Sequence, residues 1–159
     1  MESVKDLIEI LKSQETLYSE MRDILEAEKE CVVTWDAEKT IDLVKKKDTL
    51  AYKEKILDEA FRKCLKKVEK ETGVEGLKVL DIADSHAGEY SEELHEVRNN
   101  LILVVRDISE LNLSLKILYK TNISLIDGVF SKLGIAGTNT YGINKGYSQA
   151  RTSTISRTG

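Results

Sequence analysis

The chain has 159 residues, a formal net charge of −4 and no proline. Proline costs about 3 kcal/mol inside a helix, so its complete absence favours long helices. A content of 33% charged but only 6% aromatic residues is more typical of a helical bundle than of a β-sandwich or barrel. The acidic balance excludes a general nucleic-acid binder, which needs a basic face. The longest apolar run, Leu101 to Val105, is too short for membrane insertion, which takes about 20 residues.

The N-terminal residues and the two cysteines point to the same compartment. Glu2 and Asp6 interrupt the N-terminal segment, which lacks the apolar core of a secretory signal, so the sequence predicts a cytoplasmic protein. Cys31 and Cys64 fall at apolar positions of predicted helices, and a pair this sparse is not a disulfide framework. We interpret both as small core residues in a reducing compartment.

The first part of the chain predicts an antiparallel helical hairpin. Its first helix is expected to begin near Ser3, where Ser3 and Asp6 form a weak capping box. Asp36 is a good N-cap for a second helix, which should end before Gly73. Apolar residues recur at mostly helical spacings in both segments. A short helix is expected at residues 77–83, between glycines.

The clearest pattern in the chain is a heptad repeat. From residue 90 to residue 129, twelve positions follow alternating steps of four and three, and eleven of them are apolar, Asn122 being the exception. This period predicts coiled-coil packing of a helix over residues 89–133, which is about 67 Å long at 1.5 Å per residue. The predicted fold is therefore all-α: an antiparallel hairpin packed on one long C-terminal helix, a coiled-coil bundle.

Residues 134–159 differ in composition from the rest of the chain. They hold five of the nine glycines and three basic residues without an acid, so this segment carries +3 and the preceding residues −7. With few apolar residues it cannot offset its ordering entropy, and we expect disorder in isolation. The sequence thus predicts a helical bundle domain at residues 1–133 and a flexible basic tail at residues 134–159.

No arrangement of reactive side chains predicts an enzyme. Neither His86 nor His95 pairs with a cysteine at metal-ligand spacing, so we interpret both as surface histidines. A di-iron site would need a Glu-x-x-His pair on each of two helices, and the chain has only Glu92-x-x-His95. No glycine-rich phosphate loop follows a predicted strand. We expect no catalytic activity, no cofactor and no metal.

The predicted helix lengths leave part of the long helix uncovered. At 1.5 Å per residue the two hairpin helices span about 45 and 52 Å, which is about 15 to 20 Å less than the long helix. An apolar stripe left open usually marks a partner site, and an amphipathic helix of another protein is a suitable occupant. The residues expected to bind such a client are Leu118, Asn122, Leu125, Ile126, Val129, Phe130 and Leu133.

The same stripe could be covered without a client. The short helix could lie on it, or two copies of the chain could pair through it as a homodimer, which would make the protein a self-associating coiled-coil scaffold. Asn122 could likewise be structural, because a single buried amide selects helix register. A membrane-surface helix is disfavoured, because residues 90–133 carry six acids against five bases.

Motifs along nearly the whole chain resemble those of the FlgN family of flagellar type III export chaperones. They are Glu28-x-x-Cys31-Val32, Asp36, Leu43-x-x-x-Lys47-x-x-Leu50, the segment NISLIDGVFSKLG at residues 122–134, and Thr140-Tyr141-Gly142. The last is the most specific, because it is similar to the family's Thr/Leu-Tyr-Gly signature after the long helix. The family usually has a second glycine three residues after the first, whereas here Gly146 follows Gly142 by four.

The resemblance implies a function and two partners. Chaperones of this family bind the C-terminal amphipathic helices of hook–filament junction proteins of the FlgK and FlgL type and prevent their premature assembly. They also dock on the cytoplasmic domain of the export-gate protein FlhA through the tyrosine of the tail. Carried over by position, the docking residues are Tyr141 and Gly142, with Tyr147 as a weaker candidate. A tyrosine in a polar tail suits a transient anchor, since it offers a large contact area with few rotatable bonds.

Overall fold

The computed structural model describes residues 1–135, and this range contains helices but no strand. The chain divides into two compact units, residues 1–115 and residues 116–159. The predicted disorder of residues 134–159 falls almost wholly outside the described residues and stays a prediction, as does the domain boundary after residue 133.

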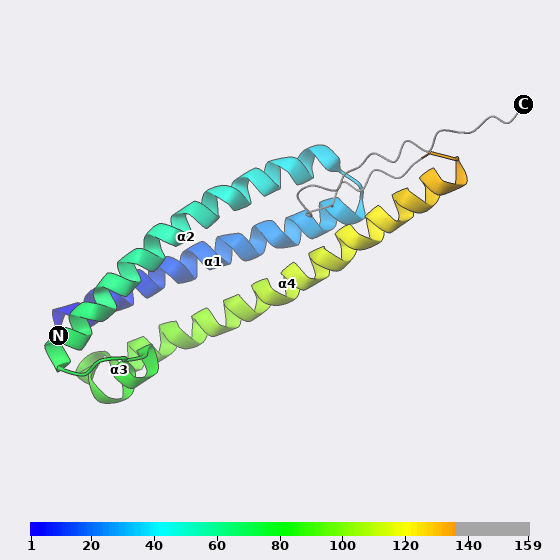
Figure 1. Ribbon diagram of the computed structural model, residues 1–159. Helices are drawn as coiled ribbons and strands as arrows, with labels where there is room; N and C mark the ends of the chain where they lie inside the picture. Colours follow the sequence, from blue (N-terminus) through cyan, green and yellow to red (C-terminus); the bar gives the residue numbers. More distant parts are fainter. Residues whose placement is uncertain (136–159) are drawn as a thin grey trace, which may run out of the picture. The chain divides into compact units, whose positions relative to one another are not determined.

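Two long helices, α1 (Glu2–Val33) and α2 (Ala37–Thr72), form the antiparallel hairpin that the sequence predicts (Figure 1). They are followed by the short helix α3 (Val79–Ser85), a single 3-10 turn (Gly88–Tyr90) and the long helix α4 (Ser91–Lys132). These bounds confirm the all-α fold class, the short connecting helix and the long C-terminal helix.

The three long helices differ less in length than the sequence pattern indicates. α4 has 42 residues, against 32 in α1 and 36 in α2. At 1.5 Å per residue, α4 is about 15 Å longer than α1 and about 9 Å longer than α2. The excess over α1 therefore lies at the lower end of the predicted 15 to 20 Å and the excess over α2 lies below it, mainly because α4 is three residues shorter than the predicted 89–133.

The helix ends show which local signals decide the structure. Asp36 caps α2 as predicted, since its Oδ1 accepts a hydrogen bond from the backbone N–H of Lys39 at 3.1 Å. Gly73 ends α2 with a φ of 71°, a conformation that favours glycine. The predicted capping box at Ser3 is wrong. Ser3 lies buried inside α1, and its hydroxyl donates to the carboxylate of Glu71 on α2, so a partner across the hairpin replaces the local backbone.

The corner between α1 and α2 contains the only tryptophan of the chain. Trp35 has a φ of 59°, which is rare for a bulky side chain because Cβ then crowds the backbone. The N–H of the next residue, Asp36, donates to the carbonyl of Cys31 at 2.9 Å and closes the turn. The Trp35 side chain is 56% exposed. This one strained residue lets α2 begin shortly after the end of α1.

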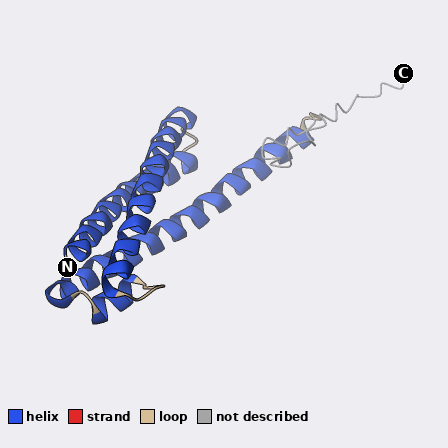
Figure 2. Ribbon diagram, turned by 60° about the vertical axis from the view of Figure 1, so that its left-hand side comes forward, coloured by secondary structure: helices blue, strands red, loops and turns tan. Residues whose placement is uncertain are grey.

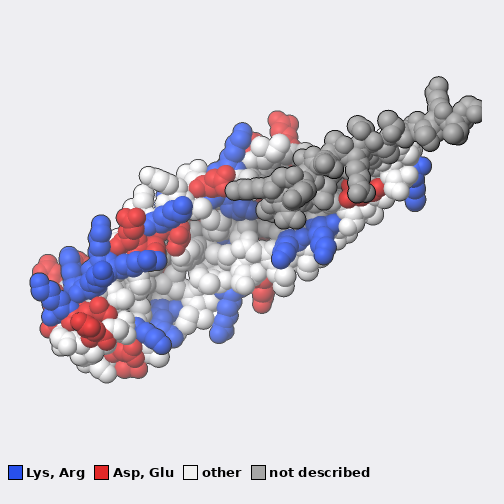
Figure 3. Space-filling view, viewed as in Figure 1, with Lys and Arg blue, Asp and Glu red and all other residues white. Residues whose placement is uncertain are grey.

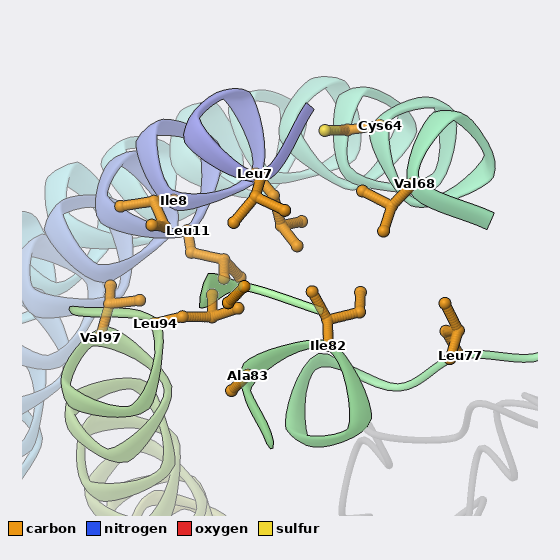
Figure 4. Close-up of a cluster of buried hydrophobic side chains, with 12 residues drawn as sticks. Leu7, Ile8, Leu11, Cys64, Val68, Leu77, Ile82, Ala83, Leu94 and Val97 are labelled. Carbon is orange, nitrogen blue, oxygen red and sulfur yellow. The ribbon is translucent and has the colours of Figure 1, made fainter. Parts of the chain in front are cut away.

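The main hydrophobic core of the first unit lies where the start of α1, the end of α2, α3 and the start of α4 come together (Figures 2 and 4). Side chains from all four helices point into it in Figure 4. Its buried members are Val4, Leu7, Ile8, Leu11, Cys64, Val68, Leu77, Ile82, Ala83, Ala87, Leu94 and Val97. Ile82 and Ala83 of α3 join the same cluster as Leu94 and Val97 of α4, so α3 links the start of α4 to the hairpin.

Both cysteines are buried free thiols, as the sequence predicts. Cys31 and Cys64 are each 4% exposed. Burial, followed by the nearby Asp6 carboxylate, raises the pKa of the Cys64 thiol. Its Sγ lies 3.3 Å from the carbonyl oxygen of Ser3, to which it donates. Cys64 therefore behaves as a protonated core residue.

Candidate functional site

The heptad positions of α4 pass from buried to exposed along the helix. Within the first unit, every heptad position from Leu94 to Leu115 is buried or half-buried, so the heptad face of α4 turns inward. In the second unit, Leu118 and Asn122 are half-buried, and the next two heptad positions, Leu125 and Val129, are exposed. The apolar pattern thus continues beyond the point where it is covered.

An exposed apolar stripe covers the last turns of α4 and the residue that directly follows the helix, Leu133. Leu125, Val129 and Leu133 recur every four residues and are 57%, 52% and 66% exposed. Ile126 beside them is 38% exposed, and Phe130 is half-buried. Four of the seven residues predicted to bind a client therefore lie at the surface of the second unit, whereas Leu118, Asn122 and Phe130 are partly covered. Contiguous apolar surface of this kind marks an interaction site in most proteins.

A cleft between α1 and α4 is a feature of the first unit that no sequence pattern predicts. It consists of two cavities of about 440 and 410 Å³, which share Tyr18 and Val105, and each has the size of a typical ligand pocket. The first cavity is lined by Leu11, Gln14, Tyr18, Val79, Arg98, Leu101, Ile102, Val105 and Arg106. The second is lined by Leu17, Tyr18, Met21, Leu25, Lys47, Asp48, Ala51, Glu54, Val105, Ile108 and Asn112.

The residues that could have indicated this cleft directly follow heptad positions of α4. Ile102 and Val105 each follow a heptad position directly and widen the apolar face of α4, and Arg98 and Arg106 flank that face. A wider face needs more cover than one neighbouring helix supplies. Val105 is accordingly 46% exposed.

Polar contacts hold the helices around the cleft. The Tyr18 hydroxyl, on α1, donates to Glu54 Oε1, on α2, at 3.1 Å. Two ion pairs join α1 to α4: Lys12 Nζ lies 2.6 Å from Glu93 Oε1, and Arg22 Nη1 lies 3.6 Å from Asp107 Oδ2. Both pairs are largely exposed and contribute little to stability, but they position α4 against α1.

Tyr18 should ionise at an unusually high pH. Burial, followed by the Glu54 carboxylate, raises its pKa from 10.0 to about 12. Because the pKa of the folded state is raised, the stabilising contribution is complete below about pH 10 and is lost as the pH rises toward 12. We expect that Tyr18→Phe removes one step near pH 12 from an ultraviolet titration of the folded protein. A variant that differs from the wild type only near pH 10 would contradict this.

Comparison with known proteins decides the family. The family model described as "FlgN protein" matches residues 1–149. The chain belongs to the FlgN family. Members of this family are flagellar export chaperones, so the general role of the protein lies in flagellum assembly. Comparisons with curated proteins and with solved structures gave no match. Tyr141 and Gly142 fall inside the matched range but outside the residues that the structure describes.

In this member of the FlgN family, the residues of α1 and α2 that carry the resemblance meet near the corner of the hairpin. Glu28 is fully buried, and its Oε2 lies 2.7 Å from Nζ of Lys47 on α2. The apolar residues of the same motifs are buried as well; they are Cys31, Val32, Leu43 and Leu50. These motifs therefore stabilise the hairpin rather than form a surface site.

The two histidines lie on either side of the turn between α3 and α4. His95 lies near the start of α4, and its Nε2 is 2.9 Å from Oδ1 of Asp84 on α3. His86 is half-buried. Within residues 1–135 there is no group of three or more histidine, cysteine, aspartate or glutamate side chains that could hold a metal ion. The same residues include no helix that is long and apolar enough to cross a membrane.

Proposed function

We propose that the protein is a cytoplasmic chaperone that binds the C-terminal amphipathic helices of hook–filament junction proteins of the FlgK and FlgL type. Membership of the FlgN family supports the general role. The observation that carries the proposal is the exposure of Leu125, Val129 and Leu133 at four-residue spacing over the last turns of α4 and the residue that follows the helix. An amphipathic helix recognises a stripe of this kind through anchors three and four residues apart.

The proposed mechanism is mutual burial of two apolar faces. Each square ångström of apolar surface removed from water contributes roughly 25 cal/mol, so an exposed leucine stripe favours a matching helix. The client segment would otherwise pack with copies of itself, because its own apolar face has no cover. While it lies on α4 that face is occupied, and the client stays unassembled and ready for export.

Charged substitutions in the stripe test the client site. We expect Leu125→Asp/Val129→Asp to weaken binding of a junction protein's C-terminal segment at least tenfold, which corresponds to about 1.4 kcal/mol, because aspartate cannot be buried against an apolar helix. Binding can be measured by calorimetry and helicity by circular dichroism. The matched control is Leu113→Asp/Ile117→Asp, since these residues are 60% and 57% exposed on the same helix with the same spacing. Equal losses in both variants would show that the stripe is not the site.

For export-gate docking we propose Tyr141, with Gly142 beside it. The family signature supports this assignment, and the three basic residues of the tail should make docking to the FlhA cytoplasmic domain sensitive to salt. Tyr141→Ala should weaken docking and leave client binding unchanged, whereas Tyr147→Ala should have the smaller effect. Docking of Tyr141→Ala at wild-type strength would remove the assignment.

A self-associating scaffold would use the same stripe, and sedimentation separates the two functions. A monomer or weak dimer that takes up the client segment supports the chaperone. A tight dimer that excludes the client segment would replace the chaperone with the scaffold.

A further inference from the structure

The cleft between α1 and α4 provides a second docking place, and its lining residues within the described part of the chain all belong to the first unit. We propose that it binds an amphipathic helix of a partner protein that carries two carboxylates, about two turns apart, beside its apolar stripe. This inference goes beyond the proposed function and does not require the stripe at the end of α4.

The shape of the cleft fits a helix. Its lining on α4 runs from Arg98 to Asn112, which is about 21 Å at 1.5 Å per residue, or the length of a helix of about 14 residues. The lining of α1 runs in parallel from Leu11 to Leu25, with Tyr18 in the middle. α1, α2 and α4 surround the second cavity as three helices of a four-helix bundle would surround the position of the fourth.

The charge of the cleft selects the partner. Among the described residues that line the first cavity, only Arg98 and Arg106 are charged, and they flank the apolar strip that contains Leu101, Ile102 and Val105. Within residues 1–135 neither guanidinium forms an ion pair, although Lys12 and Arg22 on the facing helix α1 both have carboxylate partners.

Two such guanidinium groups beside an apolar floor favour carboxylates on the incoming helix, because arginine binds a carboxylate through two parallel hydrogen bonds. Eight residues separate Arg98 from Arg106, which places them about 12 Å apart along the helix axis. The matching carboxylates on a helix aligned with α4 are therefore seven or eight residues apart. Basic residues at these positions would be repelled.

Reversing the charges of the cleft and of a bound peptide tests the proposal. The probes are two synthetic helical peptides of about 20 residues with the same leucine stripe and with either glutamate or lysine at two flanking positions eight residues apart. The full-length protein should bind the glutamate peptide about tenfold more tightly than the lysine peptide at low salt, and this preference should shrink as salt is added. Arg98→Glu/Arg106→Glu should reverse the preference, and Arg98→Gln/Arg106→Gln should abolish it. Circular dichroism checks that each variant is folded.

Two controls locate the binding site. Lys55→Glu/Lys63→Glu makes the same change in net charge at two exposed positions eight residues apart on α2, and it should leave the preference unchanged. Leu125→Asp/Val129→Asp should also leave it unchanged, even if that variant no longer binds the client. Equal affinity of the wild type for both peptides would overturn the proposal, and so would a loss of preference in either control. A third result would also overturn the proposal. If the wild type is a tight dimer that binds neither peptide, and Arg98→Glu/Arg106→Glu makes this dimer dissociate, then a second copy of the chain fills the cleft.

Discussion

Replacing Leu94 by alanine should lower the free energy of unfolding by about 3 kcal/mol. Leu94 is fully buried near the start of α4, and its side chain contacts the core that α1, α2 and α3 also form (Figure 4). Alanine would remove three carbon atoms and leave a cavity, which the rigid ends of four elements cannot close. Urea unfolding followed by circular dichroism measures the loss.

The matched control is Leu103→Ala on the same helix. Leu103 is 59% exposed, so its truncation removes little buried surface and should change the unfolding free energy by less than about 0.5 kcal/mol. The two variants lose the same atoms and carry the same change in helix propensity. Similar losses would mean that Leu94 does not join α4 to the core of the first unit.

Lys47→Met should destabilise the hairpin by about 2 to 3 kcal/mol. The Glu28 carboxylate is fully buried, and the Lys47 ammonium lies 2.7 Å from it while remaining partly exposed. Methionine keeps most of the aliphatic chain but removes the charge, so the buried carboxylate keeps its desolvation cost and loses the attraction of this ammonium group. Chemical unfolding of the variant measures this cost.

Two further variants separate the ion pair from simple packing. Lys45→Met changes an exposed lysine two residues away and should have an effect below about 0.5 kcal/mol. Glu28→Gln/Lys47→Met removes both charges and should recover part of the stability lost in Lys47→Met, because an amide is cheaper to bury than a carboxylate. If Lys47→Met is as mild as Lys45→Met, the pair does not stabilise the hairpin.

Signals that act within one helix were predictable from the sequence. Asp36 and Gly73 mark the ends of α2 because a side-chain cap and a left-handed glycine need only their neighbours along the chain. The heptad spacing identified the inward face of α4 for the same reason, since it depends on helix geometry alone. Ser3 failed as a capping signal because its partner, Glu71, is 68 residues away.

The distances between helices could not be predicted in the same way. Periodicity shows which face of α4 turns inward but not how far α4 lies from α1, so the cleft at Tyr18 and Val105 was missed. The ion pair of Glu28 and Lys47 could not be predicted either. Both residues stand in the family motifs, but the motifs do not show that the two side chains meet. Among the predicted client residues, the partial burial of Leu118 agrees with its heptad position. The exposure of Leu125 and Val129, which are also heptad positions, and the partial burial of Phe130, which is not one, had no counterpart in the spacing.

The surface that Figure 3 shows also bears on how a charged partner would approach. Basic and acidic side chains are interspersed at the end that carries α3, with uncharged surface beside them. The long-range electrostatic field at this end of the molecule is therefore weak. Under our proposal, short-range contacts with Arg98 and Arg106 then have to select acidic over basic partner helices. Discrimination between partners should then depend on dissociation rates more than on association rates.

Trp35 determines what optical measurements on this protein can report. The only indole is already hydrated in the native state, at a corner and not in the core. Its emission should shift little when the core around Leu94 melts, so a fluorescence melting curve would have a small amplitude compared with the change that circular dichroism detects. The same property makes Trp35 a sensitive reporter of contacts at the corner, because any molecule that covers the indole would shift its emission to the blue against a nearly constant background.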